Sequence, residues 1–219
     1  MPPPITPFTL EGRLVRLEPL RPELAPALLE AGMVGRETFV LTGVPDSLEA
    51  AHAYIQTAVQ AREAGLAMPF ATVRVSDGRL IGSTRFGNLE YWPWTAGNPH
   101  AKQDGTPDAA EIGWTWLEPG SQRSGINTEA KRLMLGHAFE TWRVLRVTLK
   151  TDARNVRSRN AIERLGAKFD GVLRAHVPAA DGGIRDSAWY SILAAEWPEV
   201  RARLDGMLEA QGSLNAPVK

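Results

Sequence analysis

The chain has 219 residues, of which 43% are hydrophobic and 23% charged, and its 25 basic residues are balanced by 25 acidic ones. This composition is typical of one globular domain with enough apolar surface to form a core. A balanced charge provides no overall field that would attract nucleic acid or an anionic membrane, so neither partner is expected. The chain lacks cysteine, and its four histidines lack ligand-like spacing, so no disulfide, thiolate nucleophile or metal site is expected.

No apolar run approaches the roughly 20 residues that a membrane helix needs. The first residues, Met1-Pro2-Pro3-Pro4, lack the basic start and apolar stretch of a signal peptide, so the cytoplasm is the expected compartment. Residues 1–9 are expected to form a flexible tail, residues 10–210 a single domain and residues 211–219 a second tail.

The domain is expected to begin with one strand and two helices. Arg13 to Leu17 alternates polar and apolar residues, which is the period of a half-buried strand. A short helix is expected over residues 22–32. A second helix is expected to end by Gly65, with Asp46 as its N-cap and Glu49 completing a capping box. The predicted apolar stripe of this second helix is Leu48, Ala51, Ile55 and Ala58.

A hairpin and a long loop follow. Residues 70–75 and 79–86 alternate on either side of Ser76-Asp77-Gly78, which predicts two antiparallel strands. Residues 92–108 are rich in Pro, Gly, Asn and Asp and show no periodicity, so they predict a loop of the kind that often carries function. Two tryptophans of this loop, Trp92 and Trp94, either line a substrate mouth or anchor the loop to the body.

The second half of the chain predicts strands that alternate with helices. The expected order is a strand over 111–117, a helix ending near Arg143, a strand over 145–150 and a helix over 156–165 capped by Asn155. Such an order implies parallel pairing. Strands over 169–177 and 185–193 flank a second hairpin signal, Ala180-Asp181-Gly182-Gly183, and a helix over 194–210 completes the domain. The prediction is a mixed sheet of about seven strands flanked by helices.

The connection between Leu117 and Asn127 is a candidate anion site. It joins a strand to a helix through Pro119, Gly120 and Gly125. Unpaired N–H groups and the positive end of the helix dipole favour a pyrophosphate there, and Arg123 and Ser124 add a charge and a hydroxyl group. The alternative is a plain strand-to-helix turn, and this segment alone does not distinguish the two.

Four segments together carry a family resemblance. They are Glu111-Ile112-Gly113-Trp114, Gln122-x-x-Gly125-x-Asn127, Asn155-x-x-Ser158 and Arg164-Leu165-Gly166-Ala167. From about Leu10 to Trp197 the chain resembles the GNAT superfamily of acetyl-CoA-dependent N-acetyltransferases, in the branch of RimJ/RimL-type ribosomal-protein N-terminal acetyltransferases. The resemblance implies a single α/β domain with a mostly antiparallel sheet and splayed central parallel strands.

The same resemblance implies how coenzyme A is bound. In the family, a Q/R-x-x-G-x-G/A loop binds the pyrophosphate, which implies that role for Gln122, Arg123, Ser124, Gly125, Ile126 and Asn127, where Asn127 replaces the last small residue. The strand through Trp116 and Leu117 would pair with the pantetheine arm. Asn155 is implied as a further contact, and it either adds this contact to its capping role or only caps its helix.

The resemblance also implies a proton donor. Many members protonate the departing thiolate with a Tyr, but Glu163 occupies that region here and the RimJ/RimL-like pattern offers Ser158 as both catalytic and cofactor-binding residue. Ser158 shares a helix face with Ile162 and Leu165, so it should lean inward. The alternative for Ser158 is an N-terminal-turn serine that bonds only backbone amides.

Glu111 is the expected general base. On its strand it should lie on the face opposite Ile112, Trp114 and Trp116, and a carboxylate on a central strand is seldom there for packing alone. It would take a proton from the amine directly or through water. The alternative is a buried salt bridge to an arginine such as Arg85 or Arg146. The residues expected near the acceptor are Arg85, Trp92, Trp94 and Trp189.

The first hypothesis for function is therefore acetyl transfer from acetyl-CoA, as cosubstrate and without a metal, to a primary amine by direct attack. The acceptor would be a protein N-terminus, an amino acid or a small amine. Two alternatives stay open, a non-catalytic acyl-CoA-binding or interaction module of the same fold and an acyltransferase that uses another acyl donor. A homodimer would be a common state for such a fold.

Overall fold

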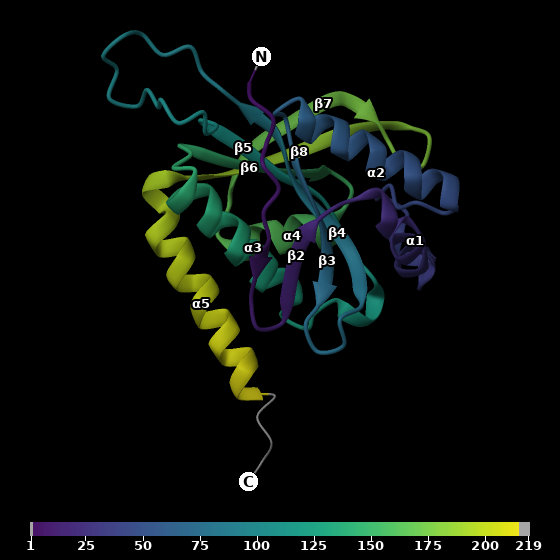
Figure 1. Ribbon diagram of the computed structural model, residues 1–219. Helices are drawn as coiled ribbons and strands as arrows, with labels where there is room; N and C mark the ends of the chain where they lie inside the picture. The colour runs from purple at the N-terminus through teal and green to yellow at the C-terminus, as the bar shows by residue number, and fades with distance from the viewer. Residues whose placement is uncertain (1, 215–219) are drawn as a thin grey trace.

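The computed structural model describes residues 2–214, and in this range eight strands form one open sheet with helices on both faces (Figure 1). The strand order is β1-β2-β3-β4-β5-β6-β8-β7. Neighbouring strands are antiparallel except for the central pair β5 and β6, which is parallel. The strands are β1 (Leu10–Glu11), β2 (Val15–Pro19), β3 (Met68–Arg74), β4 (Leu80–Glu90), β5 (Ala109–Leu117), β6 (Arg146–Asp152), β7 (Lys168–Pro178) and β8 (Ile184–Leu193).

The mixed, mostly antiparallel α/β sheet predicted from the sequence is thus confirmed. All seven predicted strands are present, and both hairpins connect neighbouring strands, β3 with β4 and β7 with β8. The eighth strand, β1, has only two residues and pairs with β2. A strand of two residues is too short to show a periodicity, so the sequence pattern did not predict β1.

Helices cover the two faces of the sheet unequally. Apolar residues of α1 and α2 form one core with Ala71 and Trp116 of the sheet, and α3, α4 and α5 bury a larger core on the other face. Figure 1 shows α1 and α2 on one side and α5 on the opposite side. The α-helices are α1 (Ala25–Met33), α2 (Leu48–Glu63), α3 (Ile126–Gly136), α4 (Val156–Leu165) and α5 (Trp197–Leu214). Shorter helical turns are η1 (Pro22–Leu24), η2 (Arg36–Phe39), η3 (Pro119–Ser121), η4 (His137–Thr141) and η5 (Ala194–Glu196).

Helix α2 begins one residue later than its capping-box signal predicted. Ser47 is the N-cap, and its Oγ accepts a hydrogen bond from the Ala50 N–H at 3.1 Å. Asp46 instead lies 3.6 Å from Arg36 in an ion pair. Leu48 is consequently the first helical residue and is 46% exposed, so the buried stripe contains only Ala51, Ile55 and Ala58.

The central parallel strands separate along their length. Ala109, Ala110 and Glu111 of β5 pair with residues 146–148 of β6, and no pairing continues beyond them. Residues 112–117 of β5 therefore diverge from residues 149–152 of β6. This is the splayed parallel pair that the family resemblance implied, and Glu111 lies at the point where the strands part.

The N-terminal segment lies against the body. Residues 2–9 have no regular secondary structure, but the Ile5 N–H donates to the Arg62 carbonyl at 3.1 Å. Phe8 stacks on His137 with ring centroids 4.1 Å apart. At the other end, α5 continues to Leu214, past the predicted end at residue 210, and residues 215–219 of the predicted tail lie outside the described residues.

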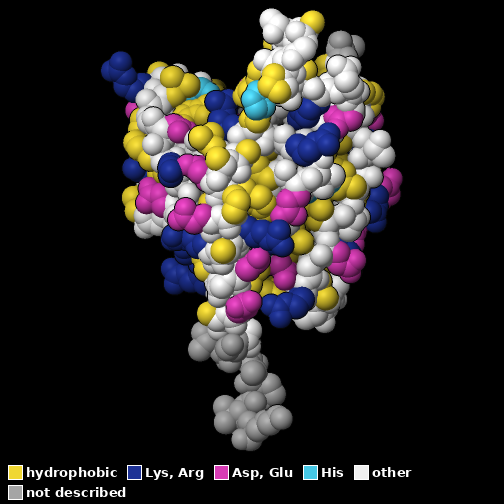
Figure 2. All heavy atoms as spheres, turned by 90° about the vertical axis from the view of Figure 1, so that its left-hand side faces the viewer, with side chains coloured by type: hydrophobic (Ala, Val, Ile, Leu, Met, Phe, Trp, Pro, Cys, Tyr) yellow, Lys and Arg dark blue, Asp and Glu magenta, His cyan; other side chains and the backbone are white. Residues whose placement is uncertain are grey.

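Charges of both signs are interspersed on the face that contains α5 (Figure 2). Arg132 pairs with Asp205 at 2.7 Å, and Arg201 pairs with Glu140 at 3.1 Å. Between residues 2 and 214 no helix has the length and apolar character needed to cross a membrane.

Candidate functional site

The loop between β5 and α3 presents a run of unpaired backbone amides. Arg123 and Gly125 have φ values of +61° and +87°, so the chain turns sharply before α3 begins. Among the described residues, none accepts a hydrogen bond from the N–H groups of residues 123–128. Such amides at a helix start, together with the helix dipole, form an anion-binding position.

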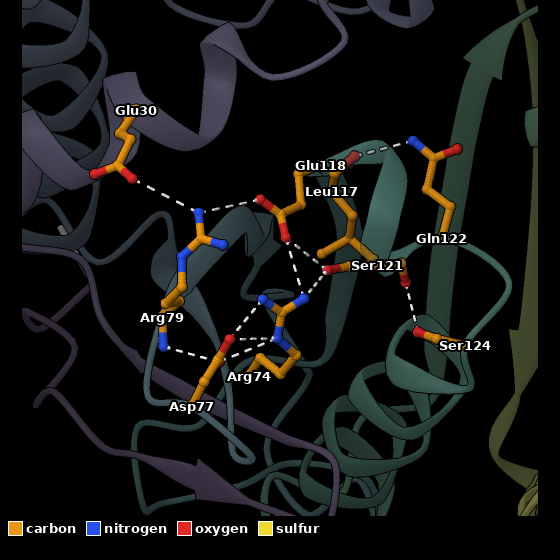
Figure 3. A network of polar contacts seen from close by, with 9 residues as sticks. All are labelled: Glu30, Arg74, Asp77, Arg79, Leu117, Glu118, Ser121, Gln122 and Ser124. Atoms are coloured by element: carbon orange, nitrogen blue, oxygen red, sulfur yellow. Dashed lines mark hydrogen bonds and ion pairs between the residues drawn. The ribbon is translucent and has the colours of Figure 1, made fainter. Parts of the chain in front are cut away.

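Side chains within the loop fix its shape (Figure 3). Gln122 Nε2 donates to the Leu117 carbonyl at 3.0 Å, and Ser124 Oγ donates to the Ser121 carbonyl at 2.6 Å. The predicted Gln122 and Ser124 are therefore engaged in folding the loop, and its free donors are the main-chain amides. Asn127 is half-buried and its Oδ1 is fully buried without a partner, so this oxygen does not face solvent at the helix start.

A buried carboxylate ties the same loop to the β3–β4 hairpin. Glu118 is 4% exposed and accepts hydrogen bonds from Arg74 Nη1 and Ser121 Oγ, both at 3.1 Å. Arg79 approaches the other Glu118 oxygen at 3.8 Å, and Asp77 holds Arg74 from the hairpin side at 2.7 Å. Figure 3 shows these side chains converging from the hairpin and the loop. Sequence patterns did not reveal this group, because the hairpin and the loop are far apart along the chain, with Glu118 lying 44 positions after Arg74.

The start of α4 lies beside this loop. Asn155 Oδ1 accepts a hydrogen bond from the Ser158 N–H at 3.0 Å, so Asn155 is the N-cap that the sequence predicted. The Ser158 hydroxyl group makes no hydrogen bond with any described residue. Arg157 Nη1 donates to Gln122 Oε1 at 3.2 Å, which joins α4 to the loop and brings a guanidinium close to the free amides. Arg157 was missed because nothing in the sequence distinguishes it from other helix-surface arginines.

Glu111 is buried and paired at the point where β5 and β6 part. It is 2% exposed, and its Oε2 accepts hydrogen bonds from Lys150 Nζ and Asn88 Nδ2, both at 2.7 Å. The expected alternative of a buried salt bridge is thus partly correct, but the partner is Lys150 rather than Arg85 or Arg146. Arg146 pairs with Glu90 at 3.4 Å instead. The second Glu111 oxygen, Oε1, accepts no hydrogen bond from any described residue.

A β-bulge in β5 makes the predicted faces of Trp114 and Trp116 wrong. Ser83 pairs with Trp116 and Arg85 with Gly113, so β5 has one extra residue between these pairs. The extra residue is accommodated at Trp114, whose φ of +51° is rare for a bulky side chain. The bulge reverses the alternation, and Trp114 and Trp116 lie on the same face as Glu111, not on the opposite one.

The bulge places the Trp114 ring over Gly87 and beside Arg85. A Cβ at Gly87 would lie 2.4 Å from the ring, so only glycine fits there. The Arg85 guanidinium carbon lies 4.8 Å from the Trp114 ring and 5.0 Å from the ring of Tyr54 on α2. The sequence pointed to the helix around Tyr54 as an acceptor region, but it did not predict the contact of Tyr54 with Arg85 or the position of Trp114, which depends on the bulge.

Lys150 connects Glu111 to a second aromatic residue. Its Nζ lies 4.7 Å from the ring of Trp189, and His176 packs against that ring at 5.6 Å. Burial, with repulsion from Lys150 and Arg185, lowers the pKa of His176, so its imidazole is neutral at pH 7. We call Arg85, Asn88, Glu111, Trp114, Lys150 and Trp189 the Glu111 cluster.

The other predicted tryptophans lie elsewhere. Trp92 Nε1 donates to Glu90 at 2.8 Å, and Trp94 Nε1 donates to Asp108 at 2.9 Å, so both side chains hold the base of the long loop. No hydrogen bond or ring contact joins either residue to the Glu111 cluster, and the anchoring interpretation explains both. The Trp116 side chain is also committed to packing, since it is 4% exposed and contacts Phe39 with ring centroids 5.8 Å apart.

Comparisons with known proteins agree with this geometry. Residues 14–168 match the acetyltransferase (GNAT) domain family. YdaF of Bacillus subtilis, named as a candidate ribosomal N-acetyltransferase, is 34% identical over 121 residues, which span 55% of this chain and 57% of YdaF. A candidate acetyltransferase from T. thermophilus is 35% identical with a TM-score of 0.73, over 93% of this chain and 98% of that one.

The fold likeness extends to a coenzyme A complex. The structure of RimJ from Mycobacterium smegmatis with CoA-disulfide has a TM-score of 0.75 at 22% identity, over 94% of this chain and 97% of that one. A match at this identity supports the fold alone. The domain match over most of the chain decides the family, and the chain belongs to the GNAT acetyltransferases.

Proposed function

We propose that this protein transfers the acetyl group of acetyl-CoA to a primary amine, with the pyrophosphate at the amides of residues 123–128. The observation that carries the proposal is the position of Glu111 where β5 and β6 part, on the strand that leads into those free amides. The open edges of the diverging strands would take the pantetheine arm between them, as an added strand. Trp116 and Leu117 would contribute main-chain groups, and Arg123 and Arg157 positive charge.

The residues fit coenzyme A without rearrangement of the loop. No described residue accepts a hydrogen bond from the free amides, and the Asn127 side-chain oxygen is buried rather than exposed at the helix start. Gly125 precedes α3 in a left-handed conformation, where a Cβ would meet Gln211 Oε1 at 2.2 Å. Asn155 and Ser158 flank the same region from α4, so the predicted cofactor residues form one continuous surface in this proposal.

Two side chains would handle the protons of the transfer. Acetyl-CoA supplies an acyl group that is already activated as a thioester. As the amine nitrogen bonds to the acyl carbon and the carbon–sulfur bond breaks, the amine releases one proton and the thiolate requires one. Glu111 would accept the first through its free Oε1, directly or through water, and the unengaged Ser158 hydroxyl group would pass the second to the thiolate while it takes a proton from water. Orientation on the rigid sheet would contribute much of the rate.

The relatives' names favour a protein N-terminus as acceptor, since YdaF is named as a ribosomal N-acetyltransferase. An amino acid or a small amine fits the same chemistry. A cytoplasmic location and a homodimer stay predictions of this proposal.

The test measures thiol release from acetyl-CoA with a panel of peptides, amino acids and small amines. Glu111→Gln should lower kcat/KM by about 100-fold or more, because a general base commonly contributes that much, while coenzyme A affinity stays the same. Glu90→Gln is the matched control, since Glu90, like Glu111, pairs with a basic residue of β6, in its case Arg146, but lies outside the Glu111 cluster. Coenzyme A binding without turnover of any acceptor would instead establish the non-catalytic module.

A further inference from the structure

Arg85 is a buried cation without a counter-ion. It projects from the middle of β4 and is 6% exposed. Tyr54 and Trp114 stack on its guanidinium, but their ring faces offer no hydrogen-bond acceptor. Its Nε is fully buried without a partner, and the side chain forms no ion pair with any described residue. Burying a charge without a counter-ion is costly, and cation–π contacts offset only part of that cost.

The neighbouring carboxylates are already committed. Glu111 is paired with Lys150 at 2.7 Å, and Asp152 is paired with Arg154 at 2.8 Å. Arg185, which is half-buried, lies close enough to both carboxylates to be attracted by them. The cations therefore outnumber the anions on this side of the sheet, and no described carboxylate lies at ion-pair distance from Arg85.

The guanidinium is held at a fixed place relative to Glu111. Gly87 pairs with Glu111 across β4 and β5, and Arg85 precedes Gly87 by two residues, so both side chains lie on one face of the sheet. Two residues along a strand correspond to roughly 7 Å. Tyr54 OH donates to Ser83 at 3.3 Å, which fixes one ring beside the guanidinium, and the bulge fixes the Trp114 ring 4.8 Å from the same group.

Because the two rings offer no hydrogen-bond acceptor and no described residue pairs with Arg85, the guanidinium N–H groups of Arg85 are available to a ligand. Its N–H groups match the two oxygens of a carboxylate in a bidentate pair. We infer that the acceptor is an amine that carries a carboxylate a few bonds away, bound by Arg85 while its amino group lies at Glu111. This inference rests on the proposed acetyl transfer and specifies its substrate class. Either a free amino acid or a peptide with an acidic residue next to its N-terminus supplies such a pair.

The experiment compares matched acid and amide acceptors. The first arm uses free amino acids with one to three carbons between the two groups, each against its carboxamide. The second arm uses short peptide amides with Asp or Asn at position two, which separates the peptide source from the free amino acid. In the arm whose acceptors resemble the natural substrate, either the free amino acids or the peptides, wild-type kcat/KM should be roughly 10- to 100-fold higher for the acid than for the amide.

Variants of Arg85 test whether the guanidinium causes the preference for the acid over the amide. Arg85→Gln should reduce the acid-to-amide ratio to near one, mostly by lowering turnover of the acid, and Arg85→Lys should keep part of it. Arg146→Gln, which removes an arginine paired with Glu90 on β6, should leave the ratio unchanged. A purely structural role of Arg85 would lower kcat/KM for acid and amide alike and leave the ratio intact.

Each outcome decides the inference. Turnover with an acid-to-amide ratio near one in the wild-type protein, in both arms, overturns it and leaves the proposed acetyl transfer standing. A ratio that Arg85→Gln does not change overturns it as well. If Arg85→Gln fails to fold, the wild-type ratio and Arg85→Lys still decide. Absence of turnover with every amine overturns the proposed function, and the inference with it.

Discussion

At the scale of single residues, Lys131 shows how burial changes a charged group. It lies on α3, is 4% exposed and donates to Thr84 Oγ1 at 3.0 Å and Thr115 Oγ1 at 2.6 Å. No carboxylate pairs with it among the described residues. Burial lowers the pKa of Lys131 to about 7, so the folded protein holds this proton more weakly than the unfolded chain does.

Lys131→Met is expected to raise the free energy of unfolding at pH 7 by about 1–3 kcal/mol, because it removes the cost of burying an unpaired ammonium. The two threonine hydroxyls still bond each other at 2.7 Å.

In the wild type, the free energy of unfolding should rise from about pH 7 to about pH 10, since the unfolded state binds more protons in that window. Urea unfolding at several pH values measures both effects. The Lys131→Met variant should lack this rise of the unfolding free energy with pH. A rise equal to that of the wild type would contradict the lowered pKa of Lys131.

Lys168→Met provides the control. Its side chain is 75% exposed and pairs with Glu196, so its loss should not change the slope between pH 7 and 10.

At the scale of secondary-structure elements, the loop before α3 depends on the β3–β4 hairpin. Arg74 reaches from the end of β3 to the buried Glu118 and to Ser121, which stand directly before the free amides. Without Arg74, the Glu118 carboxylate would keep only Arg79, at 3.8 Å, as a cationic partner. Arg74 is therefore expected to act as a positioning residue for the cofactor loop.

Arg74→Met should raise the KM for acetyl-CoA by about 3- to 10-fold with a smaller change in kcat, because loop order affects donor binding before chemistry. Steady-state kinetics with varied acetyl-CoA, and a coenzyme A titration, measure this split. Asp77→Asn is the matched control, since it removes the exposed partner of Arg74 on the hairpin and leaves the contact with Glu118 in place. A fall in kcat at constant KM would argue against the positioning role.

At the scale of the whole molecule, the N-terminal segment joins the two sides of the sheet. Ile5 bonds to the C-terminal end of α2, and Phe8 packs against Phe70, His137 and Trp142 with centroids 4.1 to 5.8 Å apart. Burial lowers the pKa of His137 to about 4, so its ring is neutral at pH 7 when it stacks on Phe8. The segment is thus part of the packed structure.

Phe8→Ala should lower the free energy of unfolding by about 1–3 kcal/mol, through the loss of a partly buried ring and its stacking partners. Ile184→Ala, at an exposed position of the β7–β8 hairpin, should change it by less than about 0.5 kcal/mol. Chemical denaturation followed by tryptophan fluorescence measures both. Equal small effects of the two substitutions would mean that the segment behaves as the flexible tail predicted from the sequence.

The sequence by itself determined the order and type of the elements and the family. Alternation along β2 to β4, the two hairpin turns, the cap at Asn155 and the Gln122–Gly125 loop are local patterns, so they are readable without a fold. A local pattern places a helix start only to within about one residue, so Asp46 was predicted as the cap of α2, whereas Ser47 is the cap in the structure.

Only the tertiary structure decided the arrangement around Glu111. Lys150 is its partner because β6 runs parallel to β5, 39 residues away along the chain. Trp114 and Arg85 lie together because one extra residue in β5 reverses the side-chain alternation, and Tyr54 joins them from α2. The pairing of distant strands and the position of a bulge depend on contacts between remote residues, whereas periodicity records only which neighbours along the chain share a face.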